Sequence, residues 1–427
     1  MEEKLKRMRA LVDTLNETAY AYYVLDKPVI ADAQWDALYD ELLALEKETG
    51  RQLPDSPSLR VGGAPLEGFE QHRHLNRLWS MGKAQSEGEI REWDARAQKL
   101  RTQAMEQGEA LPPISYCVEY KLDGLNLNLT YDGGLLVGAA TRGNGIVGEE
   151  ILAQVRTIRS IPARIAFQGR MEVNGEGIMR LSTLAEYNKT AQEPLKNARN
   201  AAAGALRNLD PNVTAQRKLD AFFYSIGYIE GKEFASYEEM VAFLKENRFP
   251  VAPYSKSVQT LDEAIACLHE IEAQRDSLDF LIDGAVIKIS DTATQRALGY
   301  TDKFPRWAIA FKFPAQEMVT TLLDVTWELG RTGKLTPLAH LESVDIGGVT
   351  VSRATLNNIG DIRRKHVRVG AQVWVRRSND VIPEIMGCVE DEAFDSLPEI
   401  EPPTCCPACG HTLTERGAHL FCLNRVS

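Results

Sequence analysis

Apolar residues recur every three or four positions over the first fifty residues. Over residues 2–24 this spacing predicts an amphipathic helix. A second helix is expected from Asp32, as its N-cap, to about Glu48. A stretch rich in proline and glycine follows and marks a linker. Residues 1–69 are therefore expected to form a small helical unit.

In the middle of the chain the period changes to two, which predicts β-strands. Apolar residues alternate with polar ones over 125–131, residues 132–134 form a turn, and 135–141 return as the second strand of a hairpin. Further strands are expected at 171–173, 221–228, 284–290 and 307–313, with a helix at 237–246. Because helices and strands do not alternate strictly, residues 70–316 are expected to form an α+β domain.

After residue 316 short strands dominate. They are expected at 319–328, 335–343, 349–352 and 371–377. About five short strands separated by glycine-rich turns indicate a small barrel of the OB-fold type over residues 317–402. Residues 403–427 form a separate cysteine-rich tail. The whole chain is thus expected to be an α+β multidomain protein.

Composition narrows the function classes. The chain has 427 residues, 44% hydrophobic and 26% charged, which is typical of a globular protein with two to four domains. No apolar run is long enough for a membrane span, and the first residues resemble a charged helix and not a signal peptide, so a cytoplasmic monomer without a membrane partner is expected.

The net charge of −11 argues against a simple nucleic-acid-binding module. A local basic surface is nevertheless expected between residues 351 and 380, where it could grip phosphates. Its cationic residues are Arg353, Arg363, Arg364, Lys365, Arg368, Arg376 and Arg377.

The first candidate for chemistry is the segment Glu119-Tyr120-Lys121-Leu122-Asp123-Gly124. Since alternate residues of a strand share a face, Glu119, Lys121 and Asp123 are expected to point the same way. The residues alone leave two interpretations open. Lys121 is either an edge-strand lysine paired with a carboxylate or a nucleophile.

Two more lysines lie in apolar strands downstream, Lys288 and Lys312. One such lysine is commonly a side chain that reaches out to solvent. Three are better explained by a bound phosphate, and lysines held together favour the uncharged form of one of them. Arg199 and Arg207, on one side of a short helix, and Arg142 beside Gly143 would suit the same ligand.

Taken together these segments resemble the bacterial NAD-dependent DNA ligases. The resemblance extends over nearly the whole chain. It rests on Glu119 to Gly124, Thr141-Arg142-Gly143, Arg199 to Arg207, Asp283 to Lys288, Lys312-Phe313-Pro314-Ala315, Leu329 to Gly333 and Val351 to Leu356.

The resemblance implies an adenylation (nucleotidyltransferase) core at 70–316. In that core Lys121 attacks NAD, releases nicotinamide mononucleotide and passes AMP to the 5′-phosphate of nicked double-stranded DNA in replication and repair. It implies catalytic roles for Lys121, Asp123, Lys288 and Lys312, nucleotide contacts for Glu119, Arg142, Glu176, Ser80, Met81, Lys288 and Lys312, and phosphate or DNA contacts for Arg199, Arg207, Arg275 and Asp283. Magnesium or manganese is the implied metal of catalysis.

The resemblance also implies that the N-terminal helices select NAD by gripping its nicotinamide mononucleotide half. Tyr22, Asp32, Trp35 and Asp36 are the implied contacts. Tyr23 stands where the family usually has histidine, and Trp35 where it usually has tyrosine, which indicates a divergent member. Core packing and helix capping are the alternative interpretation of these positions.

The tail contains Cys406, Cys409 and Cys422, three ligands typical of a zinc finger. The family's fourth cysteine would fall at or just beyond residue 427, so a partial finger is expected, with His411 or His419 as possible substitutes. The family's helix-hairpin-helix and BRCT domains do not occur in this sequence, and a fragment or a truncated gene is therefore expected.

Two other functions remain open from the sequence. One is an ATP-using nucleotidyltransferase, such as an RNA ligase or a capping enzyme. The other is a DNA-nick-binding paralogue with weakened catalysis. The predicted N-terminal unit argues against the first, and the three lysines argue against the second.

Overall fold

The computed structural model describes residues 1–427 except 62, 63, 65, 194, 196, 197, 314, 315, 347, 348, 378–381 and 425–427. Gly62, Gly63 and Pro65 of the predicted linker, and Pro314 and Ala315 of the last motif of the core, lie outside the described residues. The chain divides into two compact units, Met1–Phe313 and Pro314–Ser427. Each is described by itself below.

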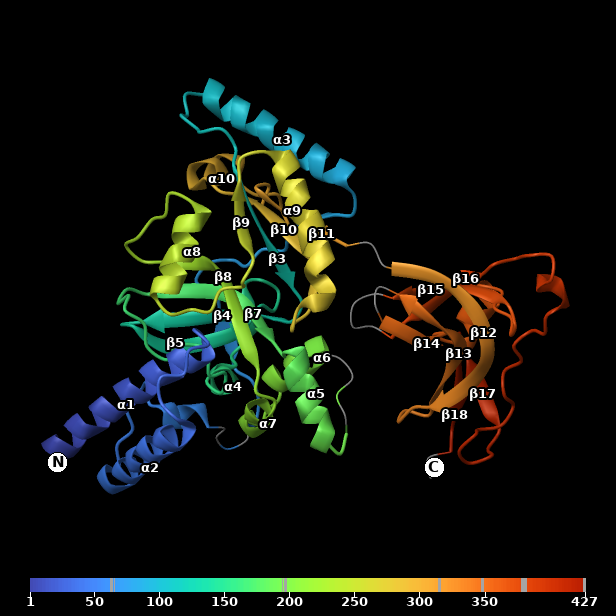
Figure 1. Cartoon of the computed structure of the whole chain (residues 1–427), viewed down its shortest axis with the longest axis horizontal. Helices are drawn as coiled ribbons and strands as arrows, with labels where there is room; N and C mark the ends of the chain where they lie inside the picture. The colour runs from blue at the N-terminus through green and yellow to red at the C-terminus, as the bar shows by residue number, and fades with distance from the viewer. Residues whose placement is uncertain are drawn as a thin grey trace. The chain divides into compact units, whose positions relative to one another are not determined.

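The first unit begins with two long helices, α1 (Glu2–Tyr23) and α2 (Asp32–Thr49), which pack against each other (Figure 1). Met8, Leu11 and Leu15 of α1 are buried with Leu42 of α2. The prediction that Asp32 caps α2 is wrong. Ala31 is the N-cap, its amide donates to the side chain of Gln34, and Asp32 lies in the first turn, where a carboxylate interacts favourably with the helix dipole.

Two sheets form the core of the first unit. One has the order β2 (Lys83–Ala84), β11 (Ala308–Lys312), β10 (Ile282–Ile289), β3 (Tyr116–Leu122), β9 (Ser255–Val258). The other has the order β5 (Leu135–Thr141), β4 (Leu125–Asp132), β7 (Met171–Ile178), β8 (Asp220–Ile229). A separate two-stranded ribbon pairs β1 (Gln71–Arg73) with β6 (Val147–Glu149).

Helices pack on both sheets and bury their apolar faces there (Figure 1). The β3 sheet shares its core with α3 (Glu87–Glu106), α9 (Leu261–Gln274) and α10 (Thr292–Leu298). The β4 sheet shares its core with α4 (Leu152–Val155), α6 (Ala198–Leu206) and α8 (Tyr237–Glu246). Shorter or more exposed elements are η1 (Pro57–Arg60), α5 (Leu181–Thr190), α7 (Pro211–Gln216) and η2 (Arg275–Ser277).

The second unit is built around a closed five-stranded barrel. Its strands are β12 (Gln316–Leu329), β13 (Lys334–Ile346), β14 (Val349–Thr355), β15 (Gln372–Arg377) and β16 (Glu384–Cys388). The ring closes because β12 pairs with both β13 and β15. β12 and β13 have 14 and 13 residues, longer than the short strands expected, since β12 pairs with two strands and β13 with three.

The remaining elements of the second unit are α11 (Ile359–Arg364), η3 (Phe394–Ser396), β17 (Leu413–Arg416) and β18 (His419–Cys422). β18 pairs with β13, so the cysteine-rich tail is joined to the barrel sheet. The multidomain α+β architecture with an OB-type barrel is confirmed. Among the described residues, no helix is both long and apolar enough to cross a membrane.

Candidate active site

The three lysines share one face of the β3 sheet. Lys121 at the end of β3 and Lys312 at the end of β11 both lie opposite Gly284 of β10. Residues in register point to the same face, and so does Lys288, four positions along β10 from Gly284. The positions of β11 beside this stretch of β10 are Ala308 and Ala310. Both of these side chains on β11 are small.

Lys121 is paired with Asp283. Its Nζ donates to both carboxylate oxygens, each at 2.9 Å, and each side chain is about one quarter exposed. The register of β3 against β10 shifts between Ile282 and Gly284, which makes Asp283 the extra residue of a bulge. A bulge can redirect a side chain, and here it brings the Asp283 carboxylate to the Lys121 ammonium.

Lys288 and Glu119 form a second, deeper pair. The Lys288 Nζ lies 2.5 Å from Glu119 Oε1 and donates to the Tyr237 hydroxyl at 3.1 Å. Tyr237 in turn donates to Glu119 Oε2 at 2.7 Å, and Lys288 is only 3% exposed. Burial raises the pKa of Tyr237 well above its usual range, so the hydroxyl stays protonated. In this state the Lys288 charge is neutralised by Glu119.

Lys312 has no hydrogen-bond or ion-pair partner among the residues that the structure describes. Its side chain is half-buried at the end of β11. Of the three lysines it is therefore the one whose charge is available to a ligand without breaking an existing pair.

The β4 sheet contributes Glu176 of β7 and Asn126 of β4, which are cross-strand neighbours. The Tyr224 hydroxyl donates to Glu176 Oε2 at 3.4 Å, and Asn126 Nδ2 donates to Tyr224 Oη at 2.7 Å. Burial raises the pKa of Glu176 to about 7, while the Lys121 ammonium acts in the opposite direction. The Lys288 Nζ lies 5.1 Å from the Tyr224 ring centre, so side chains of the two sheets meet at this ring.

The predicted phosphate-contacting arginines have acidic or aromatic neighbours. Arg199 of α6 has its Nε 3.3 Å from the Asp123 carboxylate, and Asp123 is buried. Arg207, just past the end of α6, pairs with Glu149 at 3.1 Å. Arg275 places its guanidinium 5.4 Å from the centre of the Phe313 ring. The prediction that both arginines lie on one helix is wrong for Arg207, since α6 ends at Leu206. The two arginines contact different carboxylates, and both remain more than half exposed.

Two other predicted nucleotide contacts meet each other. Arg142, at the end of β5, donates from Nη2 to the Ser80 hydroxyl, and Ser80 is exposed. Met81, the next residue, is half-buried. The two segments are about sixty positions apart in sequence, so their contact is a result of the fold.

The predicted nicotinamide-binding residues lie on the N-terminal helices. Tyr22, Asp32 and Asp36 are exposed, and none of them forms an ion pair or a hydrogen bond with the three lysines in the described part of the chain. Trp35 stacks on Tyr39 at 5.2 Å and packs into the core between α1 and α2, which agrees with the alternative interpretation of that position.

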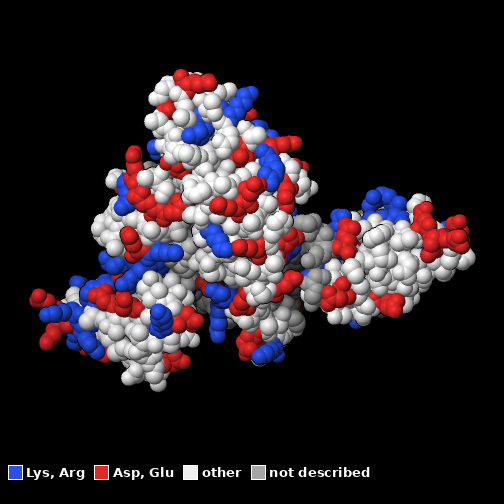
Figure 2. Space-filling view, turned by 45° about the horizontal axis from the view of Figure 1, so that its top comes forward, with Lys and Arg blue, Asp and Glu red and all other residues white. Residues whose placement is uncertain are grey.

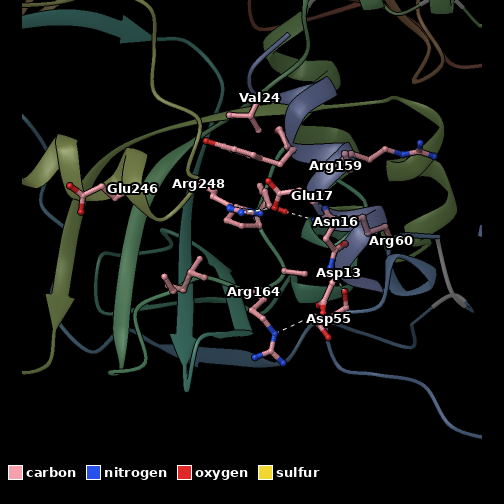
Figure 3. Close-up of a pocket in the computed structure, with 18 residues that line it drawn as sticks. Asp13, Asn16, Glu17, Val24, Asp55, Arg60, Arg159, Arg164, Glu246 and Arg248 are labelled. Atoms are coloured by element: carbon pink, nitrogen blue, oxygen red, sulfur yellow. Dashed lines mark hydrogen bonds and ion pairs between the residues drawn. The ribbon is translucent and has the colours of Figure 1, made fainter. Parts of the chain in front are cut away.

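A cavity lies elsewhere in this unit. It has a volume of about 350 Å³ and is lined mainly by α1 and the segment 159–166 (Figure 3). Its charges are largely matched internally, since Arg248 pairs with Glu17 at 2.5 Å and Arg164 with Asp55 at 2.9 Å. The cavity contains none of the predicted site residues. It marks the contact between the helical unit and the core.

The tail brings three cysteines together. The sulfur atoms of Cys406, Cys409 and Cys422 lie within 4.8 Å of one another. Three thiols at this separation fit the ligand set of a structural zinc ion. Within the described residues, neither Cys405 nor His411 nor His419 joins the group.

The basic surface predicted on the barrel is mostly neutralised within the unit. Arg363 pairs with Glu415, Lys365 with Asp361 at 2.7 Å, and Arg368 with Glu399 at 3.5 Å. Arg364 and Arg376 have acidic partners too. Figure 2 shows acidic as well as basic side chains on this unit. Arg353, on β14, is exposed.

Sequence reasoning missed Tyr224 and Tyr237, which connect the two sheets of the site. Alternation along β8 could have placed Tyr224 on one face, and the serine cap before α8 marks Tyr237 as a first-turn residue. Neither pattern says that a tyrosine will meet Lys288, because that contact joins segments fifty or more residues apart.

Three family models match the chain. Residues 1–62 match a DNA ligase-like N-terminal NAD+-binding domain, residues 66–316 the adenylation domain of NAD-dependent DNA ligases, and residues 319–396 their OB-fold domain. The matches follow one another in the order of the helices, the two-sheet core and the barrel.

Curated relatives agree with these models. The DNA ligase of Alkaliphilus metalliredigens is 57% identical over 425 residues, which cover 100% of this chain and 63% of that protein. The DNA ligase of Finegoldia magna is 54% identical and is covered to 64%. The chain thus spans a little under two thirds of the length of these relatives.

Solved structures add little. A mycobacterial DNA ligase D complexed with ATP and MES is 12% identical with a TM-score of 0.31, over 67% of this chain and 93% of that one.

Proposed function

The chain belongs to the family of NAD-dependent DNA ligases, and on that premise we propose that it uses NAD to attach AMP to its own Lys121 and then to a nick in DNA. The observation that carries the proposal is the face of the β3 sheet, where Lys121, Lys312 and Lys288 surround small residues. Such an arrangement suits a phosphate that is attacked by an amine.

In the first step the Lys121 Nζ forms a bond to the adenylyl phosphorus of NAD, and the bond from that phosphorus to the phosphate oxygen of nicotinamide mononucleotide breaks. The ammonium loses one proton before the attack and another once the P–N bond has formed. Asp283 accepts hydrogen bonds from Nζ with both oxygens and is placed to receive the first proton. The products are lysyl-AMP and nicotinamide mononucleotide.

Lys312 supports this step most directly. Like Lys121, it lies opposite Gly284, and its charge has no partner among the described residues. It can therefore stabilise the negative charge that develops on the phosphate. Lys288 contributes differently in this state, because it holds Glu119, the residue implied to contact adenine. A phosphate contact by Lys288 requires that pair to open.

Asp123 and Arg142 are proposed to hold the ribose, with Ser80 and Met81 beside them. Tyr22, Asp32, Asp36 and Trp35 are proposed to bind the nicotinamide half. For Trp35 the packing against α1 supports a structural role as well.

Magnesium or manganese fits the pair Glu176 and Asn126. The Oδ1 atom of Asn126 is buried without a hydrogen-bond partner among the described residues, and carboxylate and amide oxygens are the ligands that magnesium prefers. When bound, the ion would reduce the negative charge on the phosphates. Zinc would be held by Cys406, Cys409 and Cys422 and would stabilise the tail.

Nicked double-stranded DNA is the proposed partner for the later steps, in which AMP moves to the 5′-phosphate and the 3′-hydroxyl displaces it. Arg199, Arg207 and Arg275 are proposed to contact phosphates, since their side chains are cationic and Arg199 and Arg275 lie beside Asp123 and Phe313. As expected from the sequence, the protein is also proposed to act as a cytoplasmic monomer in replication and repair.

The test is uptake of radiolabelled AMP. The full chain should become labelled from NAD and not from ATP, and Lys121→Ala should take up no label. Lys256→Ala is the matched control, because Lys256 is an exposed lysine of the same sheet, and it should label normally. A labelled Lys121→Ala protein contradicts the nucleophile. Labelling from ATP would favour the ATP-using alternative, and no labelling of the intact chain would favour a nick-binding protein.

A further inference from the structure

A network of buried and half-buried polar side chains lies behind Arg142, and none of its members has a role in the proposed chemistry. His72 Nδ1 lies 2.7 Å from Glu150 Oε2, and His72 Nε2 lies 3.5 Å from Glu172 Oε1. Asn128 Nδ2 contacts both Glu172 Oε2, at 3.0 Å, and His74 Nδ1, at 2.8 Å. The Nε2 atom of His74 lies 3.0 Å from the Arg142 carbonyl oxygen.

The hydrogen-bond partners determine which nitrogen atoms of this network carry protons. A carbonyl oxygen only accepts, so His74 carries its proton on Nε2. Asn128 must present its amide nitrogen to the Glu172 carboxylate, which also accepts, and the same nitrogen therefore donates to the unprotonated Nδ1 of His74. His74 is thus neutral and has one defined tautomer.

The end of this network that contains Glu172 is firmly held. Glu172 is 1% exposed and also accepts from the Leu75 amide at 3.0 Å. Although burial acts to raise its pKa, the nearby His72 and the hydrogen bonds from Asn128 and the Leu75 amide hold the pKa of Glu172 below its usual range. The hydrogen bond to Glu150 and the neighbouring Glu172 carboxylate raise the pKa of His72 to about 9. His72 is therefore charged at neutral pH, and its pairs fix the position of Glu172.

The end of this network at Arg142 lies where backbone hydrogen bonds clamp residues 74–80 to the loop 142–147. The His74 amide donates to the Ile146 carbonyl at 3.0 Å and the Leu78 amide to the Gly145 carbonyl at 2.8 Å. A Cβ atom on Gly145 would lie 2.5 Å from the Leu78 carbonyl oxygen, so the two backbones approach closely. Through this clamp the Arg142 guanidinium reaches Ser80.

We propose that His74 is a positioning residue for Arg142: its Nε2–H holds the Arg142 carbonyl and thereby aims the guanidinium at the ribose side of bound NAD. The inference rests on the proposed function, because Arg142 has its nucleotide role only there. It assigns a role in NAD binding to a histidine that does not itself touch the nucleotide.

The substitutions that separate this role from simple packing are His74→Gln and His74→Asn. Glutamine can place an amide N–H near the position of Nε2, whereas the shorter asparagine places it near Nδ1 and cannot reach the Arg142 carbonyl. Asn76→Ala is the matched control on the same segment, because Asn76 donates to the Gly227 carbonyl at 2.7 Å and has no contact with Arg142.

Binding of NAD is measured by calorimetry in a full chain that also carries Lys121→Ala, so that no adduct forms. His74→Asn should weaken NAD binding about tenfold, as expected for loss of one buried hydrogen bond, while His74→Gln stays within about threefold and Asn76→Ala is unchanged. Equal weakening by glutamine and asparagine, or no weakening by either, overturns the inference. Thermal unfolding of each variant shows whether it is folded.

A double-mutant cycle gives the second test. If His74 acts through Arg142, His74→Asn should weaken NAD binding far less in an Arg142→Ala background. An undiminished effect overturns the inference. AMP uptake by the unmodified chain is followed separately. If that chain binds NAD without taking up AMP, only the proposed chemistry fails; if the Lys121→Ala protein binds no NAD, the inference fails too.

Discussion

At the scale of single residues, Glu176 is a proposed site residue whose pKa is raised by burial to about 7. If the ionised form binds ribose or a metal, kcat/KM for NAD should rise through about pH 7, and Glu176→Gln should remove that inflection and lower activity roughly 10- to 100-fold. The measurement is the rate of AMP uptake at limiting NAD between about pH 6 and 8. An unchanged inflection in the variant would assign it to another group.

The same residue makes a prediction about stability with the opposite sign. A carboxyl whose pKa is raised binds more protons in the folded state, so its contribution to stability falls as the pH rises from its usual range to about 7. Glu176→Gln should therefore unfold at a higher temperature than the parent above pH 7 while being less active. Glu233→Gln, at an exposed glutamate, should change neither property.

The sequence was sufficient to single out Lys121, Lys288 and Lys312 and to predict that they serve one ligand. It did not show their partners. Asp283, in the bulge of β10, contacts Lys121, which is 162 residues away in sequence. Glu119 on β3 contacts Lys288 on the neighbouring strand β10. Strand periodicity tells which face a side chain is on but not which distant strand lies beside it.

At the scale of elements, the face of the β3 sheet that carries the three lysines depends on the close approach of β10 and β11 at Gly284. A Cβ atom there would lie 2.0 Å from the Phe311 carbonyl oxygen, which is backbone and cannot rotate away. Gly284→Ala should therefore separate Lys121 from Lys312, lower the midpoint of thermal unfolding and lower the rate of AMP uptake. Gly387→Ala on β16, where a Cβ meets nothing within 4 Å, should do neither.

The docking of α1 on the core depends on Asp55, which is 1% exposed and accepts from Arg9 at 2.5 Å and Arg164 at 2.9 Å. Asp55→Asn leaves both guanidinium groups without their shared carboxylate and should destabilise the fold by about 2–4 kcal/mol in urea titrations. Asp262→Asn, which breaks the exposed pair with Arg91, should change stability by less than about 1 kcal/mol.

The Asp55 effect should also depend on pH in one direction. The two arginines hold the pKa of Asp55 below its usual range although burial opposes them, so the pair stabilises the fold above that range and is lost as the pH falls through the lowered pKa. The difference between parent and Asp55→Asn should therefore shrink in acid. A difference that grows in acid would contradict the assignment.

Elements with a strong period were predicted closely, as α1 and α8 show. β7 was predicted only to Val173, because Asn174-Gly175-Glu176-Gly177 is typical of a turn. In the fold these glycines continue the strand between β4 and β8, where a Cβ on Gly175 would lie 2.4 Å from the Phe222 carbonyl oxygen. The requirement for glycine arises from neighbouring strands and has no local signature.

At the scale of the whole molecule, the lysine face, Glu176, Tyr224 and the N-terminal helices all belong to the unit Met1–Phe313. If the adenylation site is complete there, a protein of residues 1–313 should take up AMP from NAD at nearly the rate of the full chain.

The barrel unit supplies further basic side chains, most of them already paired with acids, and is expected to contribute to DNA binding. If the full chain seals a pre-adenylated nick, the short protein should therefore fail to seal it. Both reactions are followed on gels with labelled AMP and labelled nicked DNA. Loss of AMP uptake by a folded 1–313 protein would show that the barrel unit takes part in the first step, and nick sealing by it would show that the barrel is dispensable.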